Sequence, residues 1–463
     1  MTVFEELKKF SVMILAYSLF ILSIVVIFSY DYYFHKRCWY DPLYLYLFFL
    51  VIYVSPLSVR YILDLGISGN VTYMYYDLRN IFPFSIVLVS VSNFVFYIAY
   101  RVRFLNLNLL KKYKKKPRYY RFLSLSGIFL FLIGFSIFLY MTSTHGGFLK
   151  FILSGYGVTE YFSENPLLAT SIPIMFVSGL FFFYAFIETG KKINIFMSFG
   201  VFAFLIMLSI VLGRRAEIVS WGLIYIINYT AIYKRIKFSY ILVLFVFGFV
   251  FLNILGVVRQ SNYHDLSNFY ERVIDKTSGD GSSSYNMFYT LVDGQFAVPY
   301  EVLPVLMETM EFDEFKLGST FFDNVGLWIP RFLWTGKGHG ISSWYYHKYY
   351  DPSAPPNEGR QFFFLAEGYL NFGVFGVLFW AALWGIIWRY IGDLYKRSSA
   401  YGYVNYFGIF VFSVYTGNML KLQASSLPGI FVVMVKQTIL WYVLGAFVAI
   451  ILSEVFRYVK VGE

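Results

Sequence analysis

Long apolar runs constrain the fold of this chain more than any other feature. Segments 122–140 and 241–255 are almost continuously apolar, which is typical of membrane-spanning helices and not of the alternating strands of a barrel. Hydrophobic residues make up 58% of the 463 residues and charged residues 14%, whereas soluble domains average about half and about a quarter. Because lipid offers the backbone no hydrogen-bond partners, we predict an all-α, polytopic membrane protein.

Hydropathy predicts about eleven spans, in a range of about ten to twelve, each of roughly 20 residues. They lie near residues 10–30, 43–59, 81–100, 122–142, 167–188, 194–212, 216–233, 238–258, 364–389, 403–420 and 428–452. They divide the chain into an amino-terminal bundle of about eight helices (1–258), a large extracytoplasmic loop with short helices (259–361) and about three carboxy-terminal helices (362–463).

Basic loops predict the orientation of these spans. The most basic loop, 101–121, is expected in the cytoplasm. The other loops on its side by alternation are also basic: 35–37, 191–192, 234–237, 389–397 and the tail from 457. This places the carboxyl terminus inside and the amino terminus and loop 259–361 outside. The net charge of +11 therefore reflects topology and does not indicate nucleic-acid binding. Cys38 is the single cysteine, which excludes an internal disulfide and a multi-cysteine metal site.

Arg214 and Arg215 lie in a turn on the predicted outer side, against the usual bias of basic residues toward the cytoplasm. One explanation is contact with lipid headgroups or a local pair with Glu217. Another is an anion site, because Arg259 ends the next outward-running span at the same level. Guanidinium groups gathered at one interface suit phosphate or pyrophosphate.

The loop after this span adds Arg331, Lys337 and His339 within nine residues. Pro330 and three nearby glycines predict a turn-rich loop rather than a helix. The loop could simply touch lipid headgroups, or it could contribute cations and a base to a site. No His-Glu-x-x-His pattern is present, so we expect no metal and no cofactor.

Glu367 lies near the outer end of a predicted span, where a carboxylate is costly to bury and tends to be functional or paired. It could form a salt bridge with Arg360, Arg331 or Arg259. Alternatively, it could act as a general base or orient a hydroxyl group in a desolvated site.

Four motifs, in this order, resemble the oligosaccharide repeat-unit polymerases, which are the Wzy-type O-antigen and capsule polymerases. They are Gly-Arg-Arg-Ala-Glu (213–217), Val-Val-Arg-Gln (257–260), Pro-Arg-Phe-Leu-Trp-Thr-Gly-Lys (330–337) and Glu-Gly-Tyr-Leu-Asn-Phe-Gly (367–373). The resemblance in topology covers nearly the whole chain. Thr335 and Gly338 stand where several members have proline, which leaves the roles of Lys337 and His339 open.

The resemblance implies a metal-independent glycosyltransferase with a helical fold of the C type, in the bacterial inner membrane with its site facing outward. The growing glycan would pass from undecaprenyl pyrophosphate to a new lipid-linked repeat unit. Glu367 or His339 would be the base. The pyrophosphate would be bound by a set of cations: Arg214, Arg215, Arg259, Arg331, Lys337 and Arg360. Expected partners are lipid-linked oligosaccharides, membrane lipids, a chain-length regulator and a flippase.

Three alternative functions stay open at this point. An O-antigen ligase, which moves glycan onto lipid A core, would share the outer loop and the Arg and His residues. A translocator of lipid-linked saccharide would carry charged residues at mid-membrane along a path, whereas the charges here gather at the outer rim. A non-catalytic partner of an export complex would not need the cluster of Arg215 and Arg259.

Overall fold

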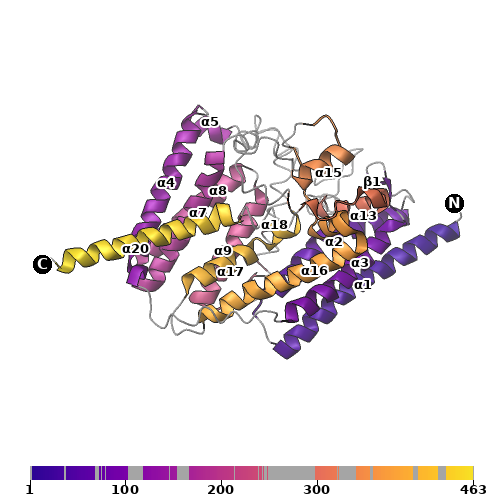
Figure 1. Ribbon diagram of the computed structural model, residues 1–463, viewed down its shortest axis with the longest axis horizontal. Helices are drawn as coiled ribbons and strands as arrows, with labels where there is room; N and C mark the ends of the chain where they lie inside the picture. Colours follow the sequence, from indigo (N-terminus) through magenta and orange to yellow (C-terminus); the bar gives the residue numbers. More distant parts are fainter. Residues whose placement is uncertain are drawn as a thin grey trace. The chain divides into compact units, whose positions relative to one another are not determined.

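In the residues that it describes, a computed structural model of the chain is almost entirely helical (Figure 1). It describes residues 3–35, 38–67, 72–73, 76–78, 80–102, 118–144, 146–153, 166–212, 214–237, 239–241, 243, 248, 298–320, 322, 340–354, 358–399, 405–425 and 434–461. Within these ranges the only strands are β1 (Thr72–Tyr73) and β2 (Tyr76–Asp77), which pair antiparallel. The chain divides into two compact units, and we describe each by itself.

Unit 1 contains residues 1–106, 285–393 and 419–432. Its long helices are α1 (Val3–His35), α2 (Pro42–Ile67), α3 (Ile81–Arg101) and the larger part of α16 (Phe364–Ser399). Its short helices are α13 (Val298–Thr309), the 3-10 turn η4 (Phe312–Glu314), α15 (Ile341–Tyr349) and α18 (Met419–Gln423).

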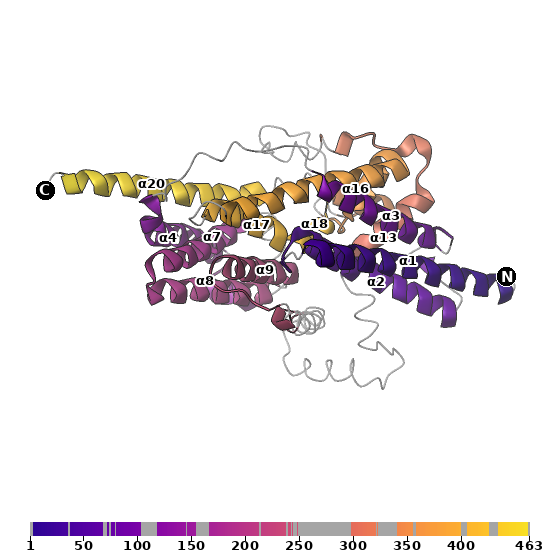
Figure 2. The same ribbon diagram turned by 90° about the horizontal axis from the view of Figure 1, so that it is seen from below.

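Helices α1, α3 and α16 belong to unit 1 and are drawn in Figures 1 and 2. Small and aromatic side chains let helices of this unit pack closely. A Cβ atom added at Gly385 of α16 would lie 2.9 Å from Ala99 Cβ and 3.0 Å from Tyr100 N on α3. The ring of Tyr46 stacks on that of Phe96 at 3.7 Å between centroids. Glycine at such positions lets helix backbones approach, which is the usual basis of helix association in membranes.

Unit 2 contains residues 107–284, 394–418 and 433–463. Its described helices are the 3-10 turn η2 (Arg118–Phe122), α4 (Leu123–Thr144), α5 (Phe148–Leu153), α7 (Pro166–Thr189), α8 (Lys192–Val211), α9 (Arg215–Ile232), α17 (Tyr406–Gly417), the π turn η6 (Val435–Ile439) and α20 (Leu440–Val461).

Polar groups buried in unit 2 form a closed hydrogen-bond chain between α7, α9 and α17. Tyr184 Oη donates to Asn228 Oδ1 at 2.7 Å, and Asn228 Nδ2 donates to Ser413 Oγ at 2.7 Å. All three residues are fully buried. Because each partner is satisfied, the chain can cross an apolar interior without leaving an unpaired polar group, which would be costly there.

Eight helices of the described residues are long and apolar enough to cross a membrane, and two shorter apolar helices, Ala216–Ile232 and Tyr406–Gly417, accompany them. Many of these helices expose large apolar side chains, for example Leu15 (60%), Phe196 (69%) and Phe447 (57%). The predicted all-α, multi-pass membrane protein is therefore confirmed. The predicted span 238–258 lies mostly outside the described residues. Spans 403–420 and 428–452 begin outside them and continue in α17 and in η6 and α20, and each of the other eight predicted spans overlaps a helix. The count of eleven and the three-part division remain predictions.

Candidate functional site

Helix α16 is broken one turn after Glu367. Phe372 (φ −144°, ψ 24°) and Gly373 (φ 61°, ψ −144°) leave the helical conformation. The positive φ of Gly373 suits glycine, which has no Cβ to clash with the backbone. Because the break interrupts the hydrogen-bond ladder of the helix, it frees carbonyl groups of the preceding turn for other donors.

A segment that follows α13 supplies these donors. We call it the 316–320 segment. Lys316 N donates to Leu370 O at 3.0 Å, and Leu317 N donates to Asn371 O at 3.2 Å. The segment therefore caps the first part of α16 with main-chain bonds and is held against the break.

Three buried polar side chains complete the contact, and we call them the Glu367 cluster: Glu367, Thr320 and Asn371. Thr320 Oγ1 donates to Glu367 Oε1 at 3.2 Å. Asn371 Nδ2 lies 2.8 Å from both Thr320 Oγ1 and the main-chain oxygen of Glu367, while Asn371 Oδ1 accepts from Gly318 N at 2.8 Å. Glu367 and Asn371 are fully buried and Thr320 is 5% exposed.

This arrangement fixes a carboxylate in a place with little water. A buried carboxyl group is costly unless it is hydrogen-bonded or paired, and a group kept at such cost is a candidate for function. An ionised carboxylate can accept about four hydrogen bonds, and the Thr320 hydroxyl supplies one of them. The cluster is therefore suited to orient a hydroxyl group and to take its proton.

Arg360 belongs to a neighbouring cluster on the segment that leads into α16. Its guanidinium forms a two-pronged ion pair with the fully buried Glu301 of α13, in which Nη2 lies 2.9 Å from Oε2 and Nε bonds Oε1. Tyr350 Oη also donates to Glu301, and its ring lies 4.1 Å under the Arg360 guanidinium. Burial next to the Glu301 carboxylate raises the pKa of Tyr350. The structure shows Arg360 bound to Glu301, a partner that the sequence analysis did not consider.

Helix α15 contains a histidine in an unusual hydrogen-bond setting. His347 Nδ1 lies 2.7 Å from Ser343 O, and Nε2 lies 2.9 Å from Ala354 O. Carbonyl oxygens only accept, so both bonds form only when both ring nitrogens carry protons. The Ser343 and Ala354 carbonyls accordingly raise the pKa of His347. This geometry favours a structural cation over a catalytic base.

Arg214 and Arg215 lie at the start of α9 in unit 2. Arg214 occupies the N-cap position, and its Nη1 lies 3.2 Å from Glu217 Oε1 in the first turn. The local pair considered from sequence is therefore present. A cation at a helix N-terminus opposes the helix dipole, so these two arginines do not stabilise α9 by that effect. Arg215 is the first residue of α9, and its side chain is not among those that the structure describes.

The remaining predicted site residues, Arg259, Arg331, Lys337 and His339, lie outside the described residues. Arg214 and Arg215 belong to unit 2, whereas Glu367 and Arg360 belong to unit 1. The gathering of the cations around one pyrophosphate therefore remains a prediction.

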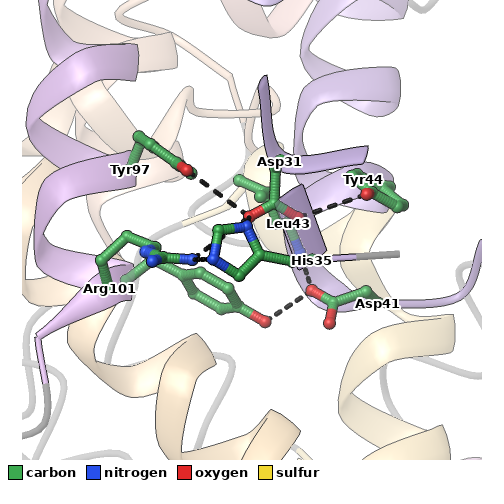
Figure 3. Close-up of polar contacts among 8 residues, drawn as sticks. Asp31, His35, Asp41, Leu43, Tyr44, Tyr97 and Arg101 are labelled. Atoms are coloured by element: carbon green, nitrogen blue, oxygen red, sulfur yellow. Dashed lines mark hydrogen bonds and ion pairs between the residues drawn. The ribbon is translucent and has the colours of Figure 1, made fainter. Parts of the chain in front are cut away.

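A second polar cluster in unit 1 connects α1, α2 and α3 (Figure 3). The carboxylate of the fully buried Asp31 accepts from Tyr44 Oη at 3.2 Å and lies 3.4 Å from His35 Nδ1 and 3.8 Å from Arg101 Nη1. Arg101 also contacts His35 Nε2. Nearby, Asp41 accepts from Tyr100 Oη at 2.5 Å. By the predicted topology these groups lie at the cytoplasmic ends of the helices, which suits a role in packing.

Sequence reasoning gave no role to Thr320, Glu301 or Asn371, although Asn371 lies within the 367–373 motif. Asn371 follows Glu367 by one helical turn and precedes Gly373, so a search for polar residues beside a helix-breaking glycine could have found it. Thr320 and Glu301 are distant in sequence from their partners, and no local pattern marks them.

Comparisons with known proteins add an independent finding. The profile of the family described as O-antigen polysaccharide polymerase Wzy matches residues 2–452 of the chain. No match was found among curated proteins or solved structures.

Proposed function

Because the chain belongs to the O-antigen polysaccharide polymerase Wzy family, we propose that it joins lipid-linked oligosaccharide repeat units by glycosyl transfer on the outer side of the bacterial inner membrane. The donor is the growing glycan on undecaprenyl pyrophosphate. The acceptor is a hydroxyl group of a new lipid-linked repeat unit. The bond from the anomeric carbon to the pyrophosphate oxygen breaks, and a bond to the acceptor oxygen forms.

In this proposal, Glu367 takes the proton of the acceptor hydroxyl. The observation that carries it is the fully buried carboxylate at the break of α16. Thr320, which donates to Oε1 at 3.2 Å, holds the carboxylate in one orientation, and Asn371 holds Thr320. A positioned general base typically contributes about 10²–10⁴-fold to a rate. His339 is the alternative base.

The pyrophosphate leaving group needs positive charge, because negative charge develops on it as the glycosidic bond breaks. We propose that Arg215, Arg259, Arg331 and Lys337 supply this charge, with Arg214 at the edge through its contact with Glu217. These cations need no metal to do so. For Arg360, the two-pronged bond to Glu301 supports a different role: it positions the segment that enters α16.

The proposed transfer implies two further proteins. A flippase would deliver the lipid-linked repeat unit to the outer side, and a chain-length regulator would limit the number of transfers. The flippase follows from the chemistry of the substrate, because a lipid-linked glycan with a charged pyrophosphate does not cross a bilayer unaided. The chain-length regulator follows from the family resemblance alone.

A complementation experiment tests this function. The wild-type gene and Glu367→Gln are expressed in a strain that lacks its polymerase, and surface glycan is separated on a gel. Glu358→Gln is the matched control, because Glu358 is an exposed carboxylate on the segment that leads into α16. We expect a ladder of chain lengths from the wild type and the control, and a single repeat unit on the core from Glu367→Gln.

The same gel separates the alternatives. If the protein were a ligase, the Glu367→Gln strain would carry no repeat unit on the core and would accumulate lipid-linked polymer. If it were a translocator, that strain would accumulate single lipid-linked units on the inner side, without polymer. A wild-type ladder from Glu367→Gln would refute the site assignment.

A further inference from the structure

Leu317 occupies a backbone position that leucine rarely adopts. Its φ is 47°, and it is the only non-glycine residue with positive φ in the part of the chain that the structure describes. Glycine, asparagine and aspartate are the residues favoured there. The Leu317 side chain is also 75% exposed. Leucine is therefore unfavourable at this position both in backbone conformation and in exposure to water. Its presence there requires another explanation.

Other exposed apolar side chains occur just before Leu317 and at the break of α16. Phe312 is 89% exposed, Phe372 is 41% exposed and Phe375 is 83% exposed. Two contacts join these segments. The Phe315 ring lies 5.7 Å from that of Phe312 and 3.3 Å from a Cβ atom added at Gly373, and Phe372 Cζ lies 3.5 Å from a Cβ atom added at Gly318. We call Phe312, Leu317, Phe372 and Phe375 the Leu317 patch.

The patch continues the lipid-facing surface of α16. Beyond the break, Phe375 and Phe379 (56% exposed) lie on the apolar span that extends to Lys396. A helix needs about 20 residues to cross the hydrocarbon. Counted back from Arg389, this length ends near Leu370 and Asn371. These are the residues whose carbonyl groups accept hydrogen bonds from the 316–320 segment. The patch therefore lies at the level where the hydrocarbon ends.

Neighbouring residues are of the kind found at a membrane surface. Lys316 Nζ lies 5.3 Å and Lys348 Nζ 5.7 Å from the ring centroid of Trp344. Tryptophan and lysine together are typical of the headgroup region. Glu311 and Asp313, on either side of Phe312, are exposed carboxylates, which limits insertion to a shallow depth.

We propose that the Leu317 patch inserts into the outer edge of the acyl-chain region of the bilayer, on the side where α16 begins. The occupant of this surface is bulk phospholipid. Insertion offsets the unfavourable backbone conformation of Leu317 and anchors the 316–320 segment, which holds the Glu367 cluster. This inference is independent of the proposed function, since it uses only exposure, backbone geometry and the apolar span.

Depth-dependent fluorescence quenching tests the proposal. Cys38 is the single cysteine, so Cys38→Ser gives a background for single-cysteine labelling. A fluorophore is attached at Leu317→Cys, at Phe312→Cys and, as the control, at Ser353→Cys, an exposed polar position after α15. The full-length protein is placed in phosphatidylcholine–phosphatidylglycerol nanodiscs that contain lipids with a nitroxide high on the acyl chain.

We expect the nitroxide lipids to quench the labels at 317 and 312, at a depth of about 5–10 Å below the headgroups, and to leave the label at 353 bright. Iodide in the water should show the opposite order. Equal quenching by iodide at 312, 317 and 353 would overturn the proposal and indicate a surface that faces water or a protein partner. Asparagine suits the positive φ, so Leu317→Asn should keep the fold. The label at position 312 should then lie less deeply in the bilayer. An unchanged depth at 312 in this variant would overturn the anchoring role of Leu317.

Discussion

Gly368→Ala provides a sharp test of the architecture around Glu367. A Cβ atom at position 368 would lie 2.5 Å from Gly376 O, 2.7 Å from Gly376 C and 3.0 Å from Val377 N. All three atoms belong to the backbone beyond the break of α16, so no side chain can rotate away. An ordinary contact begins near 3.4 Å, and the two parts of the helix would have to separate by 3.4 − 2.5 = 0.9 Å.

The expected cost follows from overpacking. Inserting a methyl group into a packed interior typically costs about 1–3 kcal/mol, and Gly368→Ala should be at the upper end because backbone must move. The matched control is Gly222→Ala in α9, where a Cβ atom would meet nothing within 4 Å. Replacing a helical glycine with alanine in open space should stabilise by about 0.5–1 kcal/mol.

Both variants are purified in detergent, and the free energy of unfolding is compared with that of the wild type by denaturant titration. The polymer ladder is recorded in cells in parallel. We expect Gly368→Ala to be less stable and to lose polymer, because the displaced backbone is next to Glu367. A Gly368→Ala variant as stable and as active as the wild type would refute the close approach of residues 368 and 376.

Three further predictions follow from individual contacts. Thr320→Val keeps the shape but removes the hydroxyl that orients Glu367, so the polymerisation rate should fall about tenfold or more while Thr320→Ser retains it; equal rates in both would argue against positioning. Asp31→Asn leaves the half-exposed Arg101 without its buried partner, and should lower the free energy of unfolding by about 1–3 kcal/mol, measured by denaturant titration. The pKa of His347 is raised in the folded protein, so its contribution to stability is present below its unfolded pKa and is lost as the pH rises through the folded value. An unfolded histidine has a pKa of about 6.5, so pH 6 and pH 9 lie on either side of it. His347→Gln should therefore reduce the difference in melting temperature between these two pH values. An unchanged difference would contradict a charged imidazole at position 347.

The helices were predictable from sequence because hydropathy reports the bilayer directly. A run of about 20 apolar residues must form a helix to satisfy its backbone, so α1, α3, α4 and α7 could be located from sequence. Glu367 was recognisable for the related reason that a carboxylate near an apolar span is unusual. The Arg214–Glu217 pair, three residues apart on one helix, was equally within reach.

Long-range contacts were not predictable in this way. Glu301 binds Arg360 across 59 residues, and Thr320 binds Glu367 across 47 residues. Neither hydropathy nor local spacing specifies which segment donates hydrogen bonds to the carbonyl groups at the break of α16. From sequence, Arg360 is a cation near a predicted anion site. Its bond to Glu301 could not be foreseen, and its binding to pyrophosphate remains a prediction.

The most direct test of the account is reconstituted polymerisation. Purified wild-type protein in nanodiscs receives a defined undecaprenyl-pyrophosphate-linked repeat unit, and chain growth and released lipid pyrophosphate are followed over time, beside Glu367→Gln and Glu358→Gln. We predict chain growth by the wild type and by Glu358→Gln, and a rate about 10²–10⁴-fold lower for Glu367→Gln. Chain growth by Glu367→Gln at the wild-type rate would contradict the claim that the buried carboxylate at the break of α16 is the base.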